Sequence, residues 1–208
     1  EGAVTFSEKV KRMSGGTLEM KVFEPGALVP GLEAIPAVSK GSVDSAWSSP
    51  GFFAGTDQAF NFFTTVPFGP AAPEFLGWMY HGGGLELSDA RFGAHNIKAI
   101  PCGITPPEAS GWFRKEINSA DDLKGLKMRI PGLGGDVMAK LGASPVSLPG
   151  GQIYENLVSG AIDATEWVGP WNGSFMKFYE AAKYYYYPGM HEPGSMLAMG
   201  MNASFWSG

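Results

Sequence analysis

Three glutamates and their neighbours could hold a cation. Glu108 lies in the loop after one expected strand, Glu166 ends another expected strand, and Glu192 lies in a Pro-Gly loop. Carboxylates that converge on one site repel each other, and a bound cation relieves that repulsion. Oxygen ligands suit hard ions such as Ca²⁺ or Na⁺ and do not suit zinc. The pattern therefore indicates either an oxygen-lined ion site or three unrelated surface acids.

Arg129 could hold an anion near that site. It lies at the end of the strand expected at 126–130. The carboxyl ends of strands in an α/β sheet border the crevice in which ligands bind. A guanidinium in such a place can grip a carboxylate through two hydrogen bonds. The alternative is a solvated arginine at the end of a strand.

The residues needed for covalent catalysis are not paired in this sequence. Cys102 is the single cysteine, which excludes an intrachain disulfide and a cysteine-based metal cluster. The three histidines occur in unrelated contexts, and no His-x-x-x-His spacing is present. The sequence therefore supports no Cys/His or Ser/His catalytic pair.

Composition excludes two further classes of function. The 208 residues carry a formal net charge of −5 without a basic run. The chain therefore lacks the clustered positive charge that is typical of nucleic-acid-binding proteins. Hydrophobic residues make up 44% and aromatic residues 13%, which is enough for a packed core. No apolar run approaches the roughly 18 residues that a membrane span requires.

Helical and strand patterns alternate along the chain, which predicts an α/β fold. Gly-containing turns separate the elements, and Ser119 is expected to cap a short turn at 120–124. The predicted helices are 3–13, 31–41, 72–80, 86–96, 136–141, 152–158 and 170–182. The predicted strands are 17–23, 43–47, 97–103, 111–117, 126–130, 144–148, 162–168, 184–187 and 196–201.

One arrangement occurs twice. Residues 37–47 and 157–167 each read as a helix, a glycine, and a short strand that carries an aspartate and ends near a tryptophan. Ligands of open α/β sheets bind beyond the carboxyl ends of strands. The repetition predicts two lobes that each supply one wall of a crevice, with chance similarity as the alternative.

Several longer motifs resemble a known family. They are Glu-Trp-Val-Gly-Pro-Trp-Asn at 166–172, Trp-Phe-Arg-Lys-Glu-Ile at 112–117, Leu-Lys-Met-Arg-Ile-Pro-Gly at 126–132, the tyrosines at 184–187, and His-Glu-Pro-Gly at 191–194. Together they are similar to the substrate-binding proteins of TRAP (tripartite ATP-independent periplasmic) transporters. The likeness extends from Phe6 to about Trp206 and favours the members that bind 2-oxo or 2-hydroxy monocarboxylates with a metal ion.

The resemblance implies a two-lobed, periplasmic-binding-protein-like α/β fold with a ligand cleft between the lobes. We expect residues 1–104 to form part of lobe I, residues 105–195 to form lobe II, and residues 196–208 to return toward lobe I. Family members have a strand before the first helix and a long helix after the last strand. The chain is therefore expected to be truncated at both ends.

The resemblance also assigns site residues. Arg129 matches the arginine that binds the substrate carboxylate. Glu166 matches a metal ligand through its side chain, and Trp167 matches both a substrate contact and a metal ligand through its backbone carbonyl. Glu192 matches a further acid of the metal site.

Two positions depart from the family pattern. Phe52 stands where relatives often have a tyrosine that faces the substrate, so one hydroxyl contact is expected to be missing. Glu108 stands where relatives that bind Na⁺ carry glutamine, and it is expected to contact both metal and substrate. The added negative charge favours Ca²⁺ over Na⁺.

The resemblance thus implies a periplasmic binding protein that is not an enzyme. Its ligand would be a small carboxylate similar to pyruvate or lactate, and its partners would be the TRAP permease subunits in the membrane. The family also implies a homodimer through the C-terminal helix. The alternative is a metal-dependent enzyme that acts on a 2-oxo acid, because a bound cation can also polarise a carbonyl.

Overall fold

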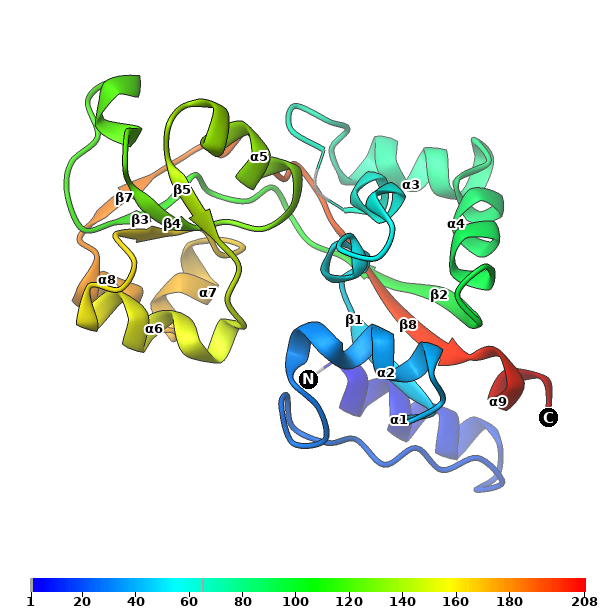
Figure 1. Cartoon of the computed structure of the whole chain (residues 1–208). Coiled ribbons are helices and arrows are strands. Elements are labelled where there is room, and N and C mark those ends of the chain that lie inside the picture. Colours follow the sequence, from blue (N-terminus) through cyan, green and yellow to red (C-terminus); the bar gives the residue numbers. More distant parts are fainter. Residues whose placement is uncertain (1, 65) are drawn as a thin grey trace.

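The computed structural model describes residues 2–64 and 66–208. Figure 1 shows two lobes, each of which has helices packed around its own β-sheet. The two-lobed α/β fold expected from the sequence is confirmed. None of the described helices is long and apolar enough to cross a membrane.

Lobe I contains a three-stranded antiparallel sheet and most of the N-terminal helices. Its strands are β1 (Ser45–Ser48), β8 (Met196–Asn202) and β2 (Ile97–Ile104), in that spatial order. Its helices are α1 (Gly2–Met13), α2 (Ala34–Ser39), α3 (Ala72–His81), α4 (Gly84–Gly93) and α9 (Ala203–Ser207), with 3₁₀ turns η1 (Gly31–Glu33), η2 (Pro50–Phe53) and η3 (Gln58–Phe63).

Lobe II contains a mixed five-stranded sheet in the order β5-β4-β6-β3-β7. The strands are β5 (Ser144–Val146), β4 (Lys127–Arg129), β6 (Ala164–Thr165), β3 (Gly111–Phe113) and β7 (Tyr184–Tyr186). The helices are α5 (Gly132–Lys140), α6 (Gly150–Ser159), α7 (Pro170–Phe175) and α8 (Phe178–Ala181), with the 3₁₀ turn η4 (Ala120–Leu123).

Each lobe has its own hydrophobic core. In lobe I, aromatic rings dominate, and Phe60 lies 5.0 Å from Phe53 and 4.6 Å from Phe92 between ring centroids. In lobe II, one cluster fills the space between the sheet and α5, and another fills the space under α6 and α8. The sheet membership of the strands supports lobe boundaries near residues 104 and 195, which stay a prediction.

Several expected elements differ from the observed ones, and three of the differences bear on the fold. Residues 17–23 are not a strand, because no described strand pairs with them, and Leu18 is 57% exposed. The helix expected at 170–182 is divided into α7 and α8 at Lys177, whose φ of +59° interrupts the helical backbone. Helix α5 begins at Gly132, four residues earlier than expected, directly after Pro131.

The expected cap and the repeated joint are both present. Ser119 and Asp122 form a reciprocal capping box on η4. Gly41 and Gly160 both have positive φ where α2 and α6 give way to a strand. The two tryptophans have different surroundings, because Trp47 packs against Phe6 of α1 and Trp167 packs in lobe II.

Two antiparallel segments connect the lobes in the described part of the chain (Figure 1), and we call them the crossing ribbon. Residues 105–110 leave β2 for β3, and residues 187–195 return from β7 to β8. They are bonded to each other. The Thr105 amide donates to the Ser195 carbonyl at 2.8 Å, and the Glu108 amide donates to the Glu192 carbonyl at 3.0 Å.

We expect Gly111→Ala to destabilise lobe II strongly. Gly111 has a φ of +127°, and an added Cβ would lie 2.3 Å from the Thr165 carbonyl oxygen of the neighbouring strand. Backbone strain of this kind costs about 1–3 kcal/mol before the steric overlap is included. Urea unfolding should show the loss, whereas Gly77→Ala, in an open position within α3, should be neutral or stabilising. Equal stability of both variants would contradict the prediction.

Candidate binding site for a carboxylate and a cation

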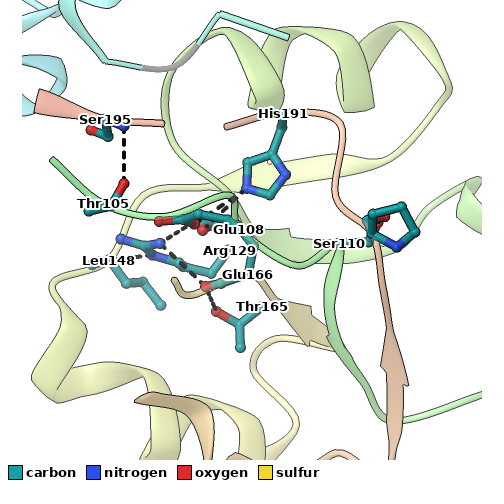
Figure 2. Close-up of polar contacts among 10 residues, drawn as sticks. Thr105, Glu108, Ser110, Arg129, Leu148, Thr165, Glu166, His191 and Ser195 are labelled. Atoms are coloured by element: carbon teal, nitrogen blue, oxygen red, sulfur yellow. Dashed lines mark hydrogen bonds and ion pairs between the residues drawn. The ribbon is translucent and has the colours of Figure 1, made fainter. Parts of the chain in front are cut away.

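Two parallel strands bring Arg129 and Glu166 together. Strands β4 and β6 are neighbours, with Arg129 paired to Thr165, and the Glu166 amide donates to the Arg129 carbonyl at 3.2 Å. Parallel strands deliver their carboxyl ends to one edge of a sheet, which explains why both side chains face the same space. Figure 2 shows them in contact.

Arg129 is 2% exposed, and its side chain is held on several sides. Its Nη1 contacts Glu166 Oε1, and its Nε donates to the Leu148 carbonyl at 3.2 Å. The guanidinium carbon lies 5.1 Å from the centre of the Trp167 ring, within range of a cation–π contact. These contacts use Nε and Nη1. Nη2 forms no hydrogen bond within residues 2–64 and 66–208, and it remains available for a ligand.

The crossing ribbon supplies the other two acids. Glu108 lies on its outgoing segment and is 5% exposed. Glu192 lies opposite on the returning segment and is half-buried. The ribbon hydrogen bond between these two residues sets their spacing. The structure therefore gathers Arg129, Glu108 and Glu166 at one place, with Glu192 near enough for its charge to interact with that of Glu166.

His191 is a site residue that the sequence analysis did not assign. Its Nε2 lies 3.6 Å from Glu108 Oε2 and 3.5 Å from Glu166 Oε2, and the residue is 2% exposed (Figure 2). The available signal was its place next to Glu192 in the His-Glu-Pro-Gly motif. The glycines at the start of α5 allow the approach, since a Cβ on Gly134 would lie 3.0 Å from His191 Cβ.

The cluster shifts the pKa values of its members strongly. Burial opposes the charge of Glu166, but Arg129 and His191 outweigh it and lower the Glu166 pKa to about 2. Burial likewise opposes a charged His191, but the neighbouring carboxylates of Glu108 and Glu166 raise its pKa to about 10. Burial, with the nearby Glu166 charge, raises the pKa of Glu192 to about 7. Burial raises the Glu108 pKa well above its usual value.

The residues present fit a bound cation. Glu108 and Glu166 each offer a carboxylate oxygen, and these atoms lie within 4.8 Å of each other and of His191 Nε2. Glu108 Oε2 and His191 Nε2 are buried without a hydrogen-bond partner among the described residues. Buried polar atoms of this kind normally have a partner, and a cation would satisfy the carboxylate.

The charge balance differs from the one implied by the sequence. The sequence analysis set three glutamates against Arg129, whereas the structure adds His191 as a second cation. Three ionised glutamates, two cationic side chains and an anionic ligand leave two negative charges. Ca²⁺ would neutralise these charges, and Na⁺ would neutralise one.

Phe52 is not part of this cluster. It lies half-buried in η2 of lobe I, and none of the contacts that define the cluster involves it. Its expected role opposite the substrate stays a prediction.

Gly150→Ala is expected to weaken carboxylate binding at least tenfold. An added Cβ would lie 2.5 Å from the Trp167 ring, so the ring must move off Arg129. The neighbouring Gly151 has open space around it, which makes Gly151→Ala a matched control in the same helix turn. Calorimetry should show normal affinity for the control. Normal affinity for both variants would show that the position of Trp167 does not matter.

The fold and this site define an extracellular solute-binding protein. Residues 1–208 match the family model "Bacterial extracellular solute-binding protein, family 7" (DctP), and the chain belongs to that family. The family resemblance found in the sequence is confirmed.

Individual relatives are similar over almost the whole chain. A monocarboxylate 2-oxoacid-binding periplasmic protein of Nostoc is 45% identical over 206 residues, covering 99% of this chain and 57% of its own length. A TRAP periplasmic solute-binding protein from Pseudoalteromonas atlantica, solved with sodium and pyruvate, has a TM-score of 0.95 and 41% identity. One from Colwellia psychrerythraea, solved with calcium and pyruvate, has a TM-score of 0.94 and 41% identity. In both structures, the match covers 99% of this chain and 62% of the other.

The chain thus spans less than two thirds of the length of these relatives.

Proposed function

We propose that this protein captures a small 2-oxo or 2-hydroxy monocarboxylate, similar to pyruvate or lactate, together with a metal ion. The observation that carries the proposal is the buried Arg129, which contacts Glu166 and whose Nη2 has no hydrogen bond to any of the described residues. A guanidinium supplies the charge and donor geometry for a carboxylate, and the acids supply oxygen ligands for a hard cation.

The division of roles follows the chemistry of each group. Arg129 would bind the ligand carboxylate, with Trp167 packed on its guanidinium. Glu108, Glu166, the Trp167 carbonyl and Glu192 would hold the ion, with Ca²⁺ favoured over Na⁺. The ion supplies a positive charge for the second oxygen of the ligand. The related structures with pyruvate and either ion support this assignment.

The site is proposed to serve transport and not catalysis. The family consists of extracellular solute-binding proteins, which supports a periplasmic location and delivery of the ligand to a TRAP permease in the membrane. A homodimer stays a prediction. The alternative enzyme, which would act on a 2-oxo acid, is distinguished by the test below.

The proposal predicts ion-dependent, ligand-specific binding. In chelator-treated buffer supplemented with Ca²⁺ or Na⁺, calorimetry should detect pyruvate or lactate. Acetate should bind far more weakly, because it lacks the second oxygen group. Equal affinity for acetate would contradict the proposed ligand class. Turnover of pyruvate by pure protein would establish the enzyme instead.

A further inference from the structure

We propose that the N-terminus of helix α6 shares the ligand carboxylate with Arg129, and that the backbone amides of Gly150 and Gly151 donate hydrogen bonds to it. The inference rests on the proposed function, because it concerns the same ligand. It adds donors that come from the main chain and that none of the side-chain assignments includes.

The start of α6 lies next to the guanidinium of Arg129. Arg129 Nε donates to the Leu148 carbonyl at 3.2 Å, and α6 begins two residues later at Gly150 (Figure 2). The Trp167 ring makes a second connection. Its centre lies 5.1 Å from the guanidinium carbon, and an added Cβ on Gly150 would lie 2.5 Å from the ring. Two separate contacts therefore hold the first turn of α6 beside Arg129.

The free donor of Arg129 points to the side of the guanidinium that faces this segment. In the planar guanidinium, the N–H of Nε and one N–H of Nη2 are parallel and share an edge. The Leu148 carbonyl lies at that edge, whereas Glu166 contacts Nη1, away from it. Arg129 is 2% exposed, and Nη2 has no hydrogen-bond partner within residues 2–64 and 66–208. A buried N–H group normally has a partner, which a ligand oxygen would supply.

The first amides of α6 are available for the same ligand. The Gln152 amide donates to the Pro149 carbonyl at 2.9 Å, whereas the amides of Gly150 and Gly151 donate to none of the described residues. Pro149 at the N-cap has no side-chain hydrogen bond to the helix. Gly151 has open space where a side chain would begin, so an anion can approach the backbone.

Electrostatics favour an anion between the helix and the arginine. The N-terminus of a helix carries a partial positive charge, and α6 is ten residues long. A guanidinium beside it repels that charge, and an anion bound to both removes the repulsion. A carboxylate has one oxygen for Arg129 Nη2 and a second for the amides. Its other oxygen-bearing carbon can then face the cation at Glu108 and Glu166.

The test compares two substitutions at one open position. Gly151→Pro removes the amide hydrogen, and proline is tolerated in the first turn of a helix. Gly151→Ala keeps the amide and is the matched control. Calorimetry with pyruvate and Ca²⁺ should show at least a tenfold loss of affinity for Gly151→Pro and less than a twofold change for Gly151→Ala. Equal affinity of the two variants would overturn the inference and leave the proposed function intact. A wild-type chain that binds no pyruvate would refute both.

A second measurement uses the wild-type chain and does not depend on the folding of the proline variant. In a chain labelled with ¹⁵N-glycine, the Gly151 signal is the one that Gly151→Ala lacks. Pyruvate with Ca²⁺ should move the Gly151 amide proton strongly downfield, as donation to a carboxylate requires. Pyruvate binding that leaves this proton unmoved, or that moves only the glycines at the start of α5, would contradict the role of α6.

Discussion

Arg129→Ala should reduce the affinity for the ligand carboxylate by about 2–5 kcal/mol, the usual loss when one partner of a buried charge pair is removed. The variant removes the donors at Nη2 and also removes the arginine charge that pairs with the buried Glu166. Calorimetry with pyruvate in the presence of Ca²⁺ measures the change. Near-normal affinity would show that the carboxylate binds elsewhere.

Two further variants separate binding from folding. Removal of one member of a buried ion pair typically costs about 3–5 kcal/mol of stability, so Arg129→Ala should also unfold at lower urea concentration. The double variant Arg129→Ala with Glu166→Gln removes both charges and should recover much of that stability without recovering ligand affinity. Arg129→Lys keeps the charge but loses the planar donor geometry, and it should bind more weakly than the wild type.

Glu108→Gln should reverse the preferred ion from Ca²⁺ to Na⁺. The wild-type site with its anionic ligand carries two net negative charges when all three glutamates are ionised, and Ca²⁺ neutralises both. The variant carries one negative charge, which Na⁺ neutralises, while Ca²⁺ leaves an excess positive charge in a buried place. Uncompensated buried charge is costly, so the reversal should be large.

Ligand calorimetry in chelator-treated buffer with either ion measures the preference. Glu74→Gln, in the first turn of α3 in lobe I, is the matched control and should behave as the wild type. If the wild type binds pyruvate equally well after chelation with Na⁺ as its only cation, the preference for Ca²⁺ is wrong. If Glu108→Gln leaves the preference unchanged, the carboxylate of Glu108 does not take part in ion binding.

Local patterns predicted the parts of the site that depend on strand ends. Arg129 ends β4 and Glu166 directly follows β6, and adjacent parallel strands bring such positions together. The crossing ribbon was harder to predict, because its pairing of Glu108 with Glu192 depends on contacts between distant parts of the chain.

His191 shows why the remainder could not be predicted. Its burial depends on Gly134 of α5, far away in the sequence, and on a helix that begins earlier than its periodicity indicates. The strand expected at 17–23 is wrong. Alternation of apolar and charged residues describes a surface that can join a sheet, but a strand also needs a partner, and no described strand pairs with these residues.

The crossing ribbon couples occupancy of the site to the relative orientation of the two lobes. Glu108, His191 and Glu192 belong to the segments that join the lobes, so any rotation of one lobe about the other passes through the backbone torsions that set their spacing (Figure 1). A ligand or ion that fixes the spacing restrains those torsions, and a change in torsion alters the fit of the ion. The same few backbone dihedral angles therefore set both the orientation of the lobes and the spacing of the site residues.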